Sequence, residues 1–388
     1  MLTFYLPILL TLHSSIFMVP FSAGMNLIGS LPMEIGILTT LTELSLFSNE
    51  ITGTLPQSIQ KLTNLDFLDI ESNQLKGSLP TWLGELTQLK FLNLGDNQIS
   101  GSIPDEIAKM TKLNEVAMDS NMLTGSLNNF HVLPNIHRLF LGENAFGGEL
   151  HTAILENNRL KELDLSTNLF NGTIPKHLFE NNRLELLDLN SNSMSGSFPA
   201  IASNTALRFL SLYNNNLSGS LPTEISNLKS LFHLDLSNNK LTGSLYGIFK
   251  TMSTLTFLFL SHNDFEQGEV PDLVQLTKLR ELSFRSTKRT GVIPDDFGFF
   301  THMVLLDLNN NALTGTIPER LGNLSNLEFL FLNRNLLGGQ IPSSFDKLGS
   351  LREYLEDIVP FLQKSISFFK LTISLCCFCF RRVRNGPQ

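Results

Sequence analysis

The sequence predicts an α/β solenoid: a superhelical horseshoe of stacked coils, with a parallel β-sheet on its concave face and irregular or 3-10 segments on its convex side. Three observations predict it. The apolar pattern L-x-x-L-x-L, whose end alternates with period two as a half-buried strand does, returns at a nearly constant interval along most of the 388 residues. An asparagine follows three residues after the last leucine of nearly every copy. A glycine follows four residues after most of these asparagines, where the chain turns back.

Each copy is one coil of this solenoid. In residues 65–87 the leucine pattern is followed by Asn73, Gly77 and Pro80. Such a coil cannot bury its own apolar edge, so it needs a copy of itself on each side. The stacked leucines would then form one continuous core, in which each buried side chain contributes about 1.5–3 kcal/mol.

The recurring asparagine carries both a donor and an acceptor, so its side chain can bond backbone groups of its own and the adjacent coil at a buried corner. It returns every 24 residues, with 23 before Asn144 and Asn215, and Thr287 takes its place once. A threonine hydroxyl has a shorter reach and offers fewer bonds. We expect these asparagines to be structural rather than chemical residues: Asn49, Asn73, Asn97, Asn121, Asn144, Asn168, Asn192, Asn215, Asn239, Asn263, Asn311 and Asn335.

These copies resemble the leucine-rich repeat family, in its plant-type subclass with an L-x-G-x-I/L-P second half. The resemblance covers roughly residues 27–351, in about thirteen repeats of 23–24 residues. It implies the fold given above and an asparagine ladder between coils. It also implies similarity to receptor-like proteins and receptor kinase ectodomains.

Three segments are expected. Residues 1–23 are a candidate signal peptide or N-terminal anchor, since residues 1–33 carry no Asp, Glu, Lys or Arg. The alternative is a degenerate first coil, because Leu27 and Leu31 already keep the repeat register. Residues 24–351 form the repeat domain. Residues 352–388 form a C-terminal cap and a candidate transmembrane segment with a short basic tail, although the apolar run is short and interrupted by lysines.

Composition and motifs exclude several functions. A net charge of −8 argues against nucleic acid, which would need a basic face. No phosphate-binding loop, zinc-protease, hydrolase or kinase motif is present, so we expect no enzyme and no cofactor. All three cysteines lie in the last thirteen residues, so the repeats carry no disulfide. The pair Cys376 and Cys379 has no second ligand pair for a metal and better suits palmitoylation of a membrane-bound tail.

The residues between the strand leucines should point out of the concave face and form the binding surface. At four such positions per coil we count thirteen acidic residues but only three basic ones, Arg138, Arg285 and Arg334. Neighbouring acids such as Asp164 and Asp188 would repel each other unless a cation intervenes. Solvated acids and packed aromatics are also ordinary in this family. The candidate ligand-binding residues are Phe140, Asp164, Asp188, Tyr213, Asp235, Phe259, Arg285 and Phe331.

One region breaks the pattern. Gly268 and Pro271 each lie one residue farther from Asn263 than the equivalent glycine and proline lie from the asparagine in other coils. The next coil has Thr287 instead of asparagine. The alternative is a drifted coil with a solvated charge cluster. We expect Arg285 to hold the acidic end of an extended ligand whose basic part lies toward the acidic coils upstream. A basic group gathers here: Lys278, Arg280, Arg285, Lys288 and Arg289.

The expected function is non-enzymatic recognition of a peptide, protein or glycan in signalling or defence, at the cell surface or in secreted form. Signalling would need a partner such as a co-receptor, since no kinase follows the repeats. Three glycosylation sequons begin at Asn171, Asn216 and Asn323. The alternatives are a secreted inhibitor, a wall-associated scaffold, or a fragment of a larger receptor kinase.

Overall fold

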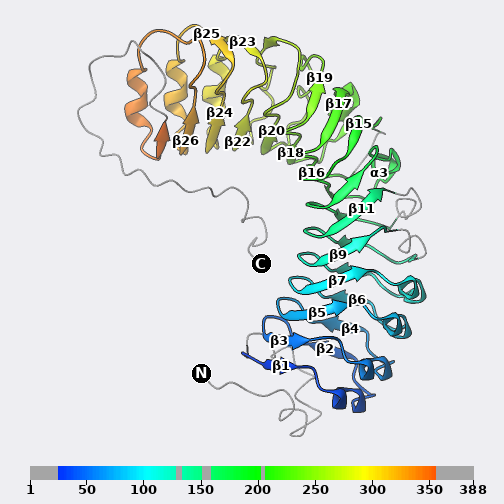
Figure 1. Cartoon of the computed structure of the whole chain (residues 1–388). Coiled ribbons are helices and arrows are strands. Elements are labelled where there is room, and N and C mark those ends of the chain that lie inside the picture. Colours follow the sequence, from blue (N-terminus) through cyan, green and yellow to red (C-terminus); the bar gives the residue numbers. More distant parts are fainter. Residues whose placement is uncertain (1–24, 128–132, 151–158, 202–205, 355–388) are drawn as a thin grey trace.

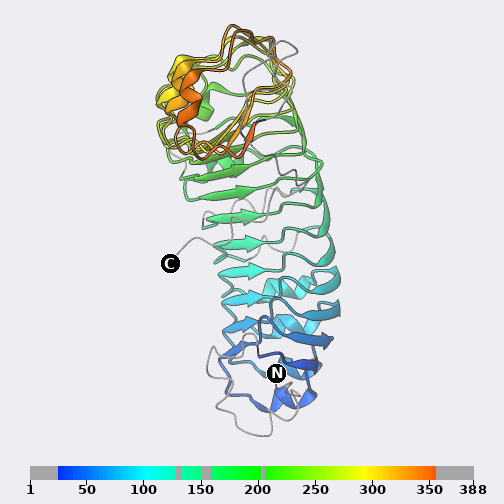
Figure 2. The same cartoon turned by 90° about the vertical axis from the view of Figure 1, so that its left-hand side faces the viewer.

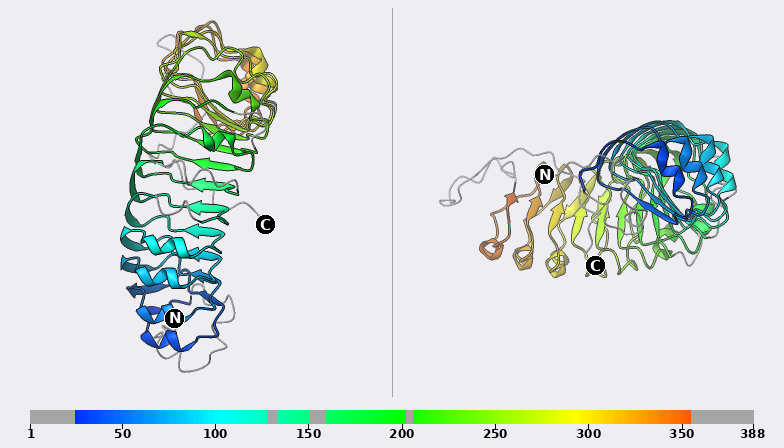
Figure 3. Two further views of the ribbon diagram at one scale, coloured as in Figure 1. Left: turned by 90° about the vertical axis from the view of Figure 1, so that its right-hand side faces the viewer. Right: turned by 90° about the horizontal axis from the view of Figure 1, so that it is seen from below.

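The computed structural model describes residues 25–127, 133–150, 159–201 and 206–354. These residues form an open arc of stacked coils with one long sheet along its inner side (Figure 1). The stack also twists, so the first and last coils are seen from different directions in one view (Figures 2 and 3). The predicted solenoid is therefore confirmed.

The inner, concave sheet contains fourteen parallel strands in chain order. Each strand pairs with the equivalent strand of the next repeat, so that equivalent residues lie opposite each other, as Leu187 and Leu210 do, and Leu210 and Leu234. The strands are β2 (Glu43–Ser45), β4 (Phe67–Asp69), β6 (Phe91–Asn93), β8 (Glu115–Ala117), β10 (Arg138–Phe140), β12 (Glu162–Asp164), β14 (Leu186–Asp188), β16 (Phe209–Ser211), β18 (His233–Asp235), β20 (Phe257–Phe259), β22 (Glu281–Ser283), β24 (Leu305–Asp307), β26 (Phe329–Phe331) and β27 (Glu353–Tyr354).

The second half of each coil forms smaller parallel sheets of seven, three and three strands. The first contains β1 (Ile28–Ser30), β3 (Glu50–Gly53), β5 (Gln74–Ser78), β7 (Gln98–Ser102), β9 (Met122–Gly125), β11 (Ala145–Glu149) and β13 (Leu169–Asn171). The second contains β15 (Ser195–Ser197), β17 (Asn216–Ser220) and β19 (Lys240–Thr242), and the third β21 (Gly268–Glu269), β23 (Arg289–Val292) and β25 (Ala312–Thr314).

Short helices cover the convex side, most of them 3-10 turns that begin after the proline of the repeat. They pack closely: a Cβ added to Gly84 would lie 2.3 Å from the backbone oxygen of Glu106 in the next coil. They are η2 (Met33–Ile37), η3 (Gln57–Lys61), η4 (Thr81–Glu85), η5 (Asp105–Lys109), α3 (His177–Glu180), η7 (Thr223–Asn227), η8 (Asp295–Phe299), η9 (Glu319–Asn323) and η10 (Ser343–Lys347).

The repeated asparagines connect each coil to its neighbours. Asn239 accepts a hydrogen bond from the Leu217 N–H at 3.0 Å, and its Nδ2 donates to the Leu212 carbonyl of the preceding coil at 2.9 Å. The same Nδ2 also donates to the carbonyls of Leu236 and Ser237 in its own coil. This arrangement satisfies buried backbone groups that water cannot reach.

The two predicted end segments lie almost entirely outside the described residues. Residues 1–23 are not described, and of 352–388 only 352–354 are. Residues 353 and 354 still belong to the concave sheet, because β27 pairs with β26. The sheet therefore extends past residue 351, the predicted end of the repeat domain. Strand pairing uses backbone groups, so the loss of the side-chain pattern after Leu351 does not end it.

Candidate functional site

The register of the concave sheet gathers most of the predicted binding residues into one row of side chains. Phe140 faces Asp164, which faces Asp188 on the next strand. Six of the eight candidates belong to this row, while Tyr213 and Arg285 each follow a row residue by two positions. From β10 to β26 the row consists of Phe140, Asp164, Asp188, Ser211, Asp235, Phe259, Ser283, Asp307 and Phe331.

An acidic pair, Asp164 and Asp188, follows Phe140 in the row. Burial, together with the charge of Asp164 on the adjacent strand, raises the pKa of Asp188 to about 7. Asn190 donates to the Asp188 Oδ1 from its backbone N–H at 3.0 Å and from Nδ2 at 2.7 Å. The repulsion expected from the sequence can therefore be relieved by a proton near neutral pH, without a bound cation.

Asp235 departs from the expectation of an outward-facing carboxylate. It is only 4% exposed and accepts a hydrogen bond from the Ser237 N–H at 2.9 Å. Its register neighbour Phe259 is large, and strands only about 4.8 Å apart leave little room for water between such side chains. Burial accordingly raises the pKa of Asp235 to about 6.

An aromatic cluster lies in the middle of the concave face, and its centre is a histidine that the sequence analysis missed. The His233 ring stacks on Phe209 at 4.3 Å between centroids and lies 5.6 Å from Phe257 and 5.8 Å from Phe259. Burial lowers the pKa of His233 to about 4, so the ring is neutral at neutral pH. The sequence contained one signal for this cluster: His233 lies 24 residues after Phe209 and 24 before Phe257, at the same position of the repeat.

Arg285 lies just beyond this cluster and is exposed. Within the described ranges no carboxylate approaches it to ion-pair distance. Arg138, by contrast, is engaged by Glu115 at 3.2 Å and by Glu162 at 3.0 Å. Of these two strand-face arginines, only Arg285 is therefore left available to an incoming anion.

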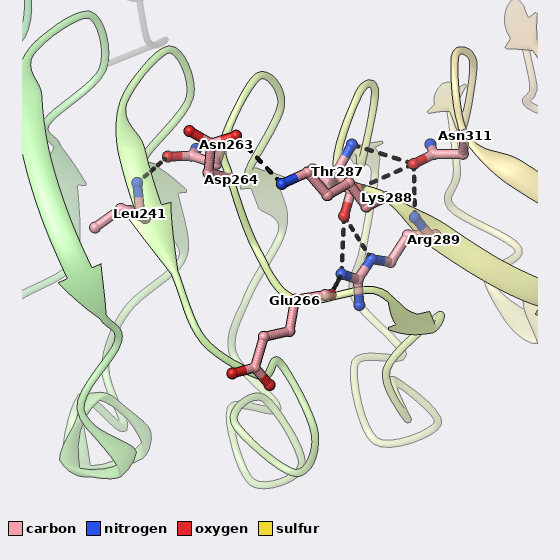
Figure 4. A network of polar contacts seen from close by, with 8 residues as sticks. All are labelled: Leu241, Asn263, Asp264, Glu266, Thr287, Lys288, Arg289 and Asn311. Atoms are coloured by element: carbon pink, nitrogen blue, oxygen red, sulfur yellow. Dashed lines mark hydrogen bonds and ion pairs between the residues drawn. The ribbon is translucent and has the colours of Figure 1, made fainter.

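Two other members of the basic group, Lys288 and Arg289, are engaged elsewhere. Lys288 pairs with Asp264 at 3.3 Å (Figure 4). Arg289, which the sequence analysis counted in the basic group, is only 2% exposed and lies in β23. The expectation of one joint basic patch is therefore wrong, because Arg289 turns into the coil, where it donates to backbone carbonyls.

The remaining candidate residues are spread along the molecule. Phe140 and Phe331 are half-buried at opposite ends of the row, and the Phe331 ring stacks on Phe329 at 6.5 Å. All three sequon asparagines, Asn171, Asn216 and Asn323, are exposed. No helix in the described part of the chain is long and apolar enough to span a membrane.

Family models match most of the repeats. The model "Leucine-rich repeat region" matches residues 24–190, and "Leucine Rich Repeat" matches residues 206–228, 230–252, 302–324 and 326–348. No curated protein sequence matches the chain.

Three solved structures show the same architecture. The ectodomain of the Arabidopsis thaliana membrane receptor kinase GASSHO1/SCHENGEN3, in complex with CASPARIAN STRIP INTEGRITY FACTOR 2, is 32% identical with a TM-score of 0.74, over 84% of this chain and 42% of that one. PEPR1 with AtPEP1 is 30% identical with a TM-score of 0.78, over 86% and 48%. The Arabidopsis receptor kinase HAESA, in complex with the peptide hormone IDA and the co-receptor SERK1, is 31% identical with a TM-score of 0.68, over 85% and 63%.

The chain thus spans about 42–63% of the length of these ectodomains. The matched repeats, the concave parallel sheet and the asparagine bonds between coils agree with one another. The chain belongs to the plant-type leucine-rich repeat family.

Proposed function

We propose that this chain is the ligand-binding part of a plant-type receptor system and that it binds an extended peptide along the concave face between β14 and β22. The observation that carries the proposal is Arg285, an exposed cation at one end of an aromatic cluster whose other end is acidic. The similar ectodomain of HAESA, whose structure contains the peptide hormone IDA, supports this class of ligand.

The charges give the ligand a direction. Its acidic end, such as a free carboxylate, would pair with Arg285, and its basic part would lie toward Asp164 and Asp188. The four strand spacings from β14 to β22 correspond to roughly 19 Å. That length is spanned by about six residues of extended chain.

The aromatic cluster between these ends supplies the apolar contact. Phe257 and Phe259 are half-buried, so part of each ring faces the concave surface. Aromatic side chains are the type most often found at the energetic centre of an interface. Tyr213 is half-buried two residues beyond β16 and would border the same ligand.

The proposal includes an extracellular location and a signalling partner. Exposed sequons at Asn171, Asn216 and Asn323 suit a glycosylated, exported chain. A second protein, acting as a co-receptor, would convert binding into a signal. The candidate segments for membrane association are residues 352–388 and the candidate N-terminal anchor, residues 1–23.

Arg285→Ala tests the placement. We would pan the full chain against synthetic peptides of about six residues with basic N-terminal halves, each made with a free C-terminus and as the C-terminal amide. We expect the free acids to bind and Arg285→Ala to weaken them at least tenfold, since a charge-assisted bond contributes about 1.5–3 kcal/mol. Binding should also fall with added salt.

Lys278→Ala is the matched control, because it removes the same charge from an exposed position that directly precedes this coil and lies away from the strand face. The Kd of Lys278→Ala for the peptide should stay within about twofold of the parent value, which corresponds to a change of less than about 0.5 kcal/mol in binding free energy. Equal binding of acid and amide, or equal losses in the two variants, would contradict this placement of the ligand.

A further inference from the structure

A second candidate site lies away from the concave face, where the repeat pattern is broken. A cavity of about 490 Å³ opens between the β21–β23 strands and η8. Residues 255–278 form a coil without the convex helix that η8 provides in the next coil. This volume lies within the range of small-molecule pockets.

Arg289 contributes to the lining of this cavity from a position that belongs to the core. It stands two residues after Thr287, where every other coil carries an apolar side chain. Despite its charge it is only 2% exposed. The equivalent residues are Ile51, Leu75, Ile99, Leu123, Phe146, Phe170, Met194, Leu217, Leu241, Phe265, Leu313 and Leu337.

The guanidinium is held by backbone carbonyls rather than by a counter-ion. Nε and Nη2 donate to the Thr287 oxygen at 2.9 and 2.8 Å, and Nη1 donates to the Glu269 oxygen at 3.2 Å. Nη2 also donates to the Glu266 oxygen, and the Glu266 carboxylate points away from the guanidinium (Figure 4). A guanidinium has five N–H groups, so these four bonds leave one at Nη1 for another acceptor.

That remaining donor is approached past Gly268. A Cβ added to this glycine would have Nη1 as its only near contact, at 3.6 Å. Gly268 and Arg289 both contribute to the cavity lining. Because residue 268 is a glycine, it places no side chain over Nη1 on the cavity side, although Arg289 as a whole is only 2% exposed.

The other walls decide which anion fits. Val270, Leu273, Phe297 and Phe300 are buried apolar residues of the lining. Exposed carboxylates lie around them, at Glu266, Glu269, Asp272 and Asp296. Like charges disfavour a dianion such as phosphate. One charged group on an apolar body is the chemistry that matches this cavity.

We propose that this cavity binds a monocarboxylate with an apolar body, its carboxylate accepting a hydrogen bond from the Arg289 Nη1 and its body packing against Leu273, Phe297 and Phe300. A buried charge is normally paired, and the bound carboxylate supplies the missing partner. The same group is presented by a small free acid and by the chain end of a peptide.

The test uses phenylacetate, N-acetylphenylalanine, phenylacetamide and inorganic phosphate, each titrated into the full chain and followed by ligand-detected NMR. We expect at least one of the two carboxylic acids to bind with a Kd of roughly 1 mM or below, and the amide and phosphate at least tenfold more weakly. Binding of both acids would indicate a small-molecule site, and binding of N-acetylphenylalanine alone a peptide C-terminus.

Two variants remove the site by different routes. Arg289→Met removes the charge and keeps the aliphatic stem, and Gly268→Val covers Nη1 without needing a strained backbone. Gly338→Val is the matched control, since a Cβ there meets nothing within 4 Å. Circular dichroism melting verifies that each variant folds. Both site variants should lose acid binding at least tenfold, and the control should keep it.

Three results would overturn the proposal. The first is that neither acid binds at up to roughly 10 mM, a concentration that detects even weak complexes. The second is that acid and amide bind alike, and the third is that Gly268→Val folds and retains full binding. These readouts do not involve Arg285, so the concave-face proposal can fail or succeed separately.

Discussion

At the scale of single residues, the concave face places carboxylates where water is scarce. Asp188 and Asp235 have raised pKa values of about 7 and about 6, with burial as the main cause in both. A raised carboxyl pKa means that the folded state holds its proton at a pH where the unfolded chain has lost it. Stability from this source is full below the unfolded value of about 3.8 and is lost as pH rises through about 7.

Asp188→Asn should therefore stabilise the protein at high pH. At pH 8 the carboxylate of the parent is charged, half-buried and beside Asp164, whereas the amide is neutral. We expect the free energy of unfolding to rise by about 1–3 kcal/mol at pH 8, with a much smaller difference at pH 5. Urea denaturation at the two pH values measures this. Asp105→Asn, at an exposed carboxylate, is the control.

A lower stability of Asp188→Asn at pH 8 would show that its hydrogen bonds with Asn190 outweigh the cost of burying its charge. The repeat pattern alone places Asp188 among the residues that point out of the concave face. Its half-buried state depends on the side chains of neighbouring strands, which a repeat pattern does not specify.

At the scale of secondary-structure elements, the coil that contains Thr287 is joined to the preceding coil in a different way from the others. Thr287 donates to the Phe284 carbonyl of its own coil at 2.6 Å. Asn239 donates from its side chain to a carbonyl of the preceding coil, and Thr287 makes no such bond. Arg289 donates to carbonyls of the preceding coil instead. One substitution in the ladder and one in the core thus occur together.

Thr287→Asn combined with Arg289→Leu restores the repeat pattern at both positions. We expect the double variant to be more stable than either single variant, with a coupling energy of at least about 1 kcal/mol. Replacing a buried ion by a well-packed apolar residue often stabilises a protein, but removing only Arg289 leaves carbonyls without donors. A double-mutant cycle in urea provides the measurement. Additive effects would mean that the two residues act independently.

The sequence predicted the regular elements well, because each follows from a pattern that repeats. The strand face, the ladder asparagines and the convex 3-10 turns all occupy fixed places in the coil. It did not predict His233 as a cluster centre, because histidine is rare at that position. It also misplaced Arg289: charge suggests exposure, and only the paths of residues 264–290 show the carbonyls that hold the side chain inside.

At the scale of the whole molecule, each coil contacts only its neighbours, so damage should spread locally. Leu187→Asp buries an unpaired charge at a fully buried position in the middle of the array. We expect a loss of several kcal/mol, with hydrogen-exchange protection falling first in β12, β14 and β16. Hydrogen exchange with mass spectrometry resolves these segments.

Leu169→Asp is the control for this change, because it makes the same substitution at a leucine that is 61% exposed. It should alter stability by no more than about 0.5 kcal/mol. Uniform loss of protection from β2 to β26 in Leu187→Asp would contradict the view that the coils are coupled only to their neighbours.

The asparagine bonds between coils also have a direction along the chain. The acceptor for the Leu217 N–H belongs to Asn239, which lies 22 residues later, and the same offset recurs for Leu241 and Asn263. During synthesis a coil that has left the ribosome therefore still lacks this bond until the strand half of the next coil, up to its asparagine, has been translated. Folding should follow translation with a lag of about one repeat, and a pause within a repeat would leave the newest coil open to proteases.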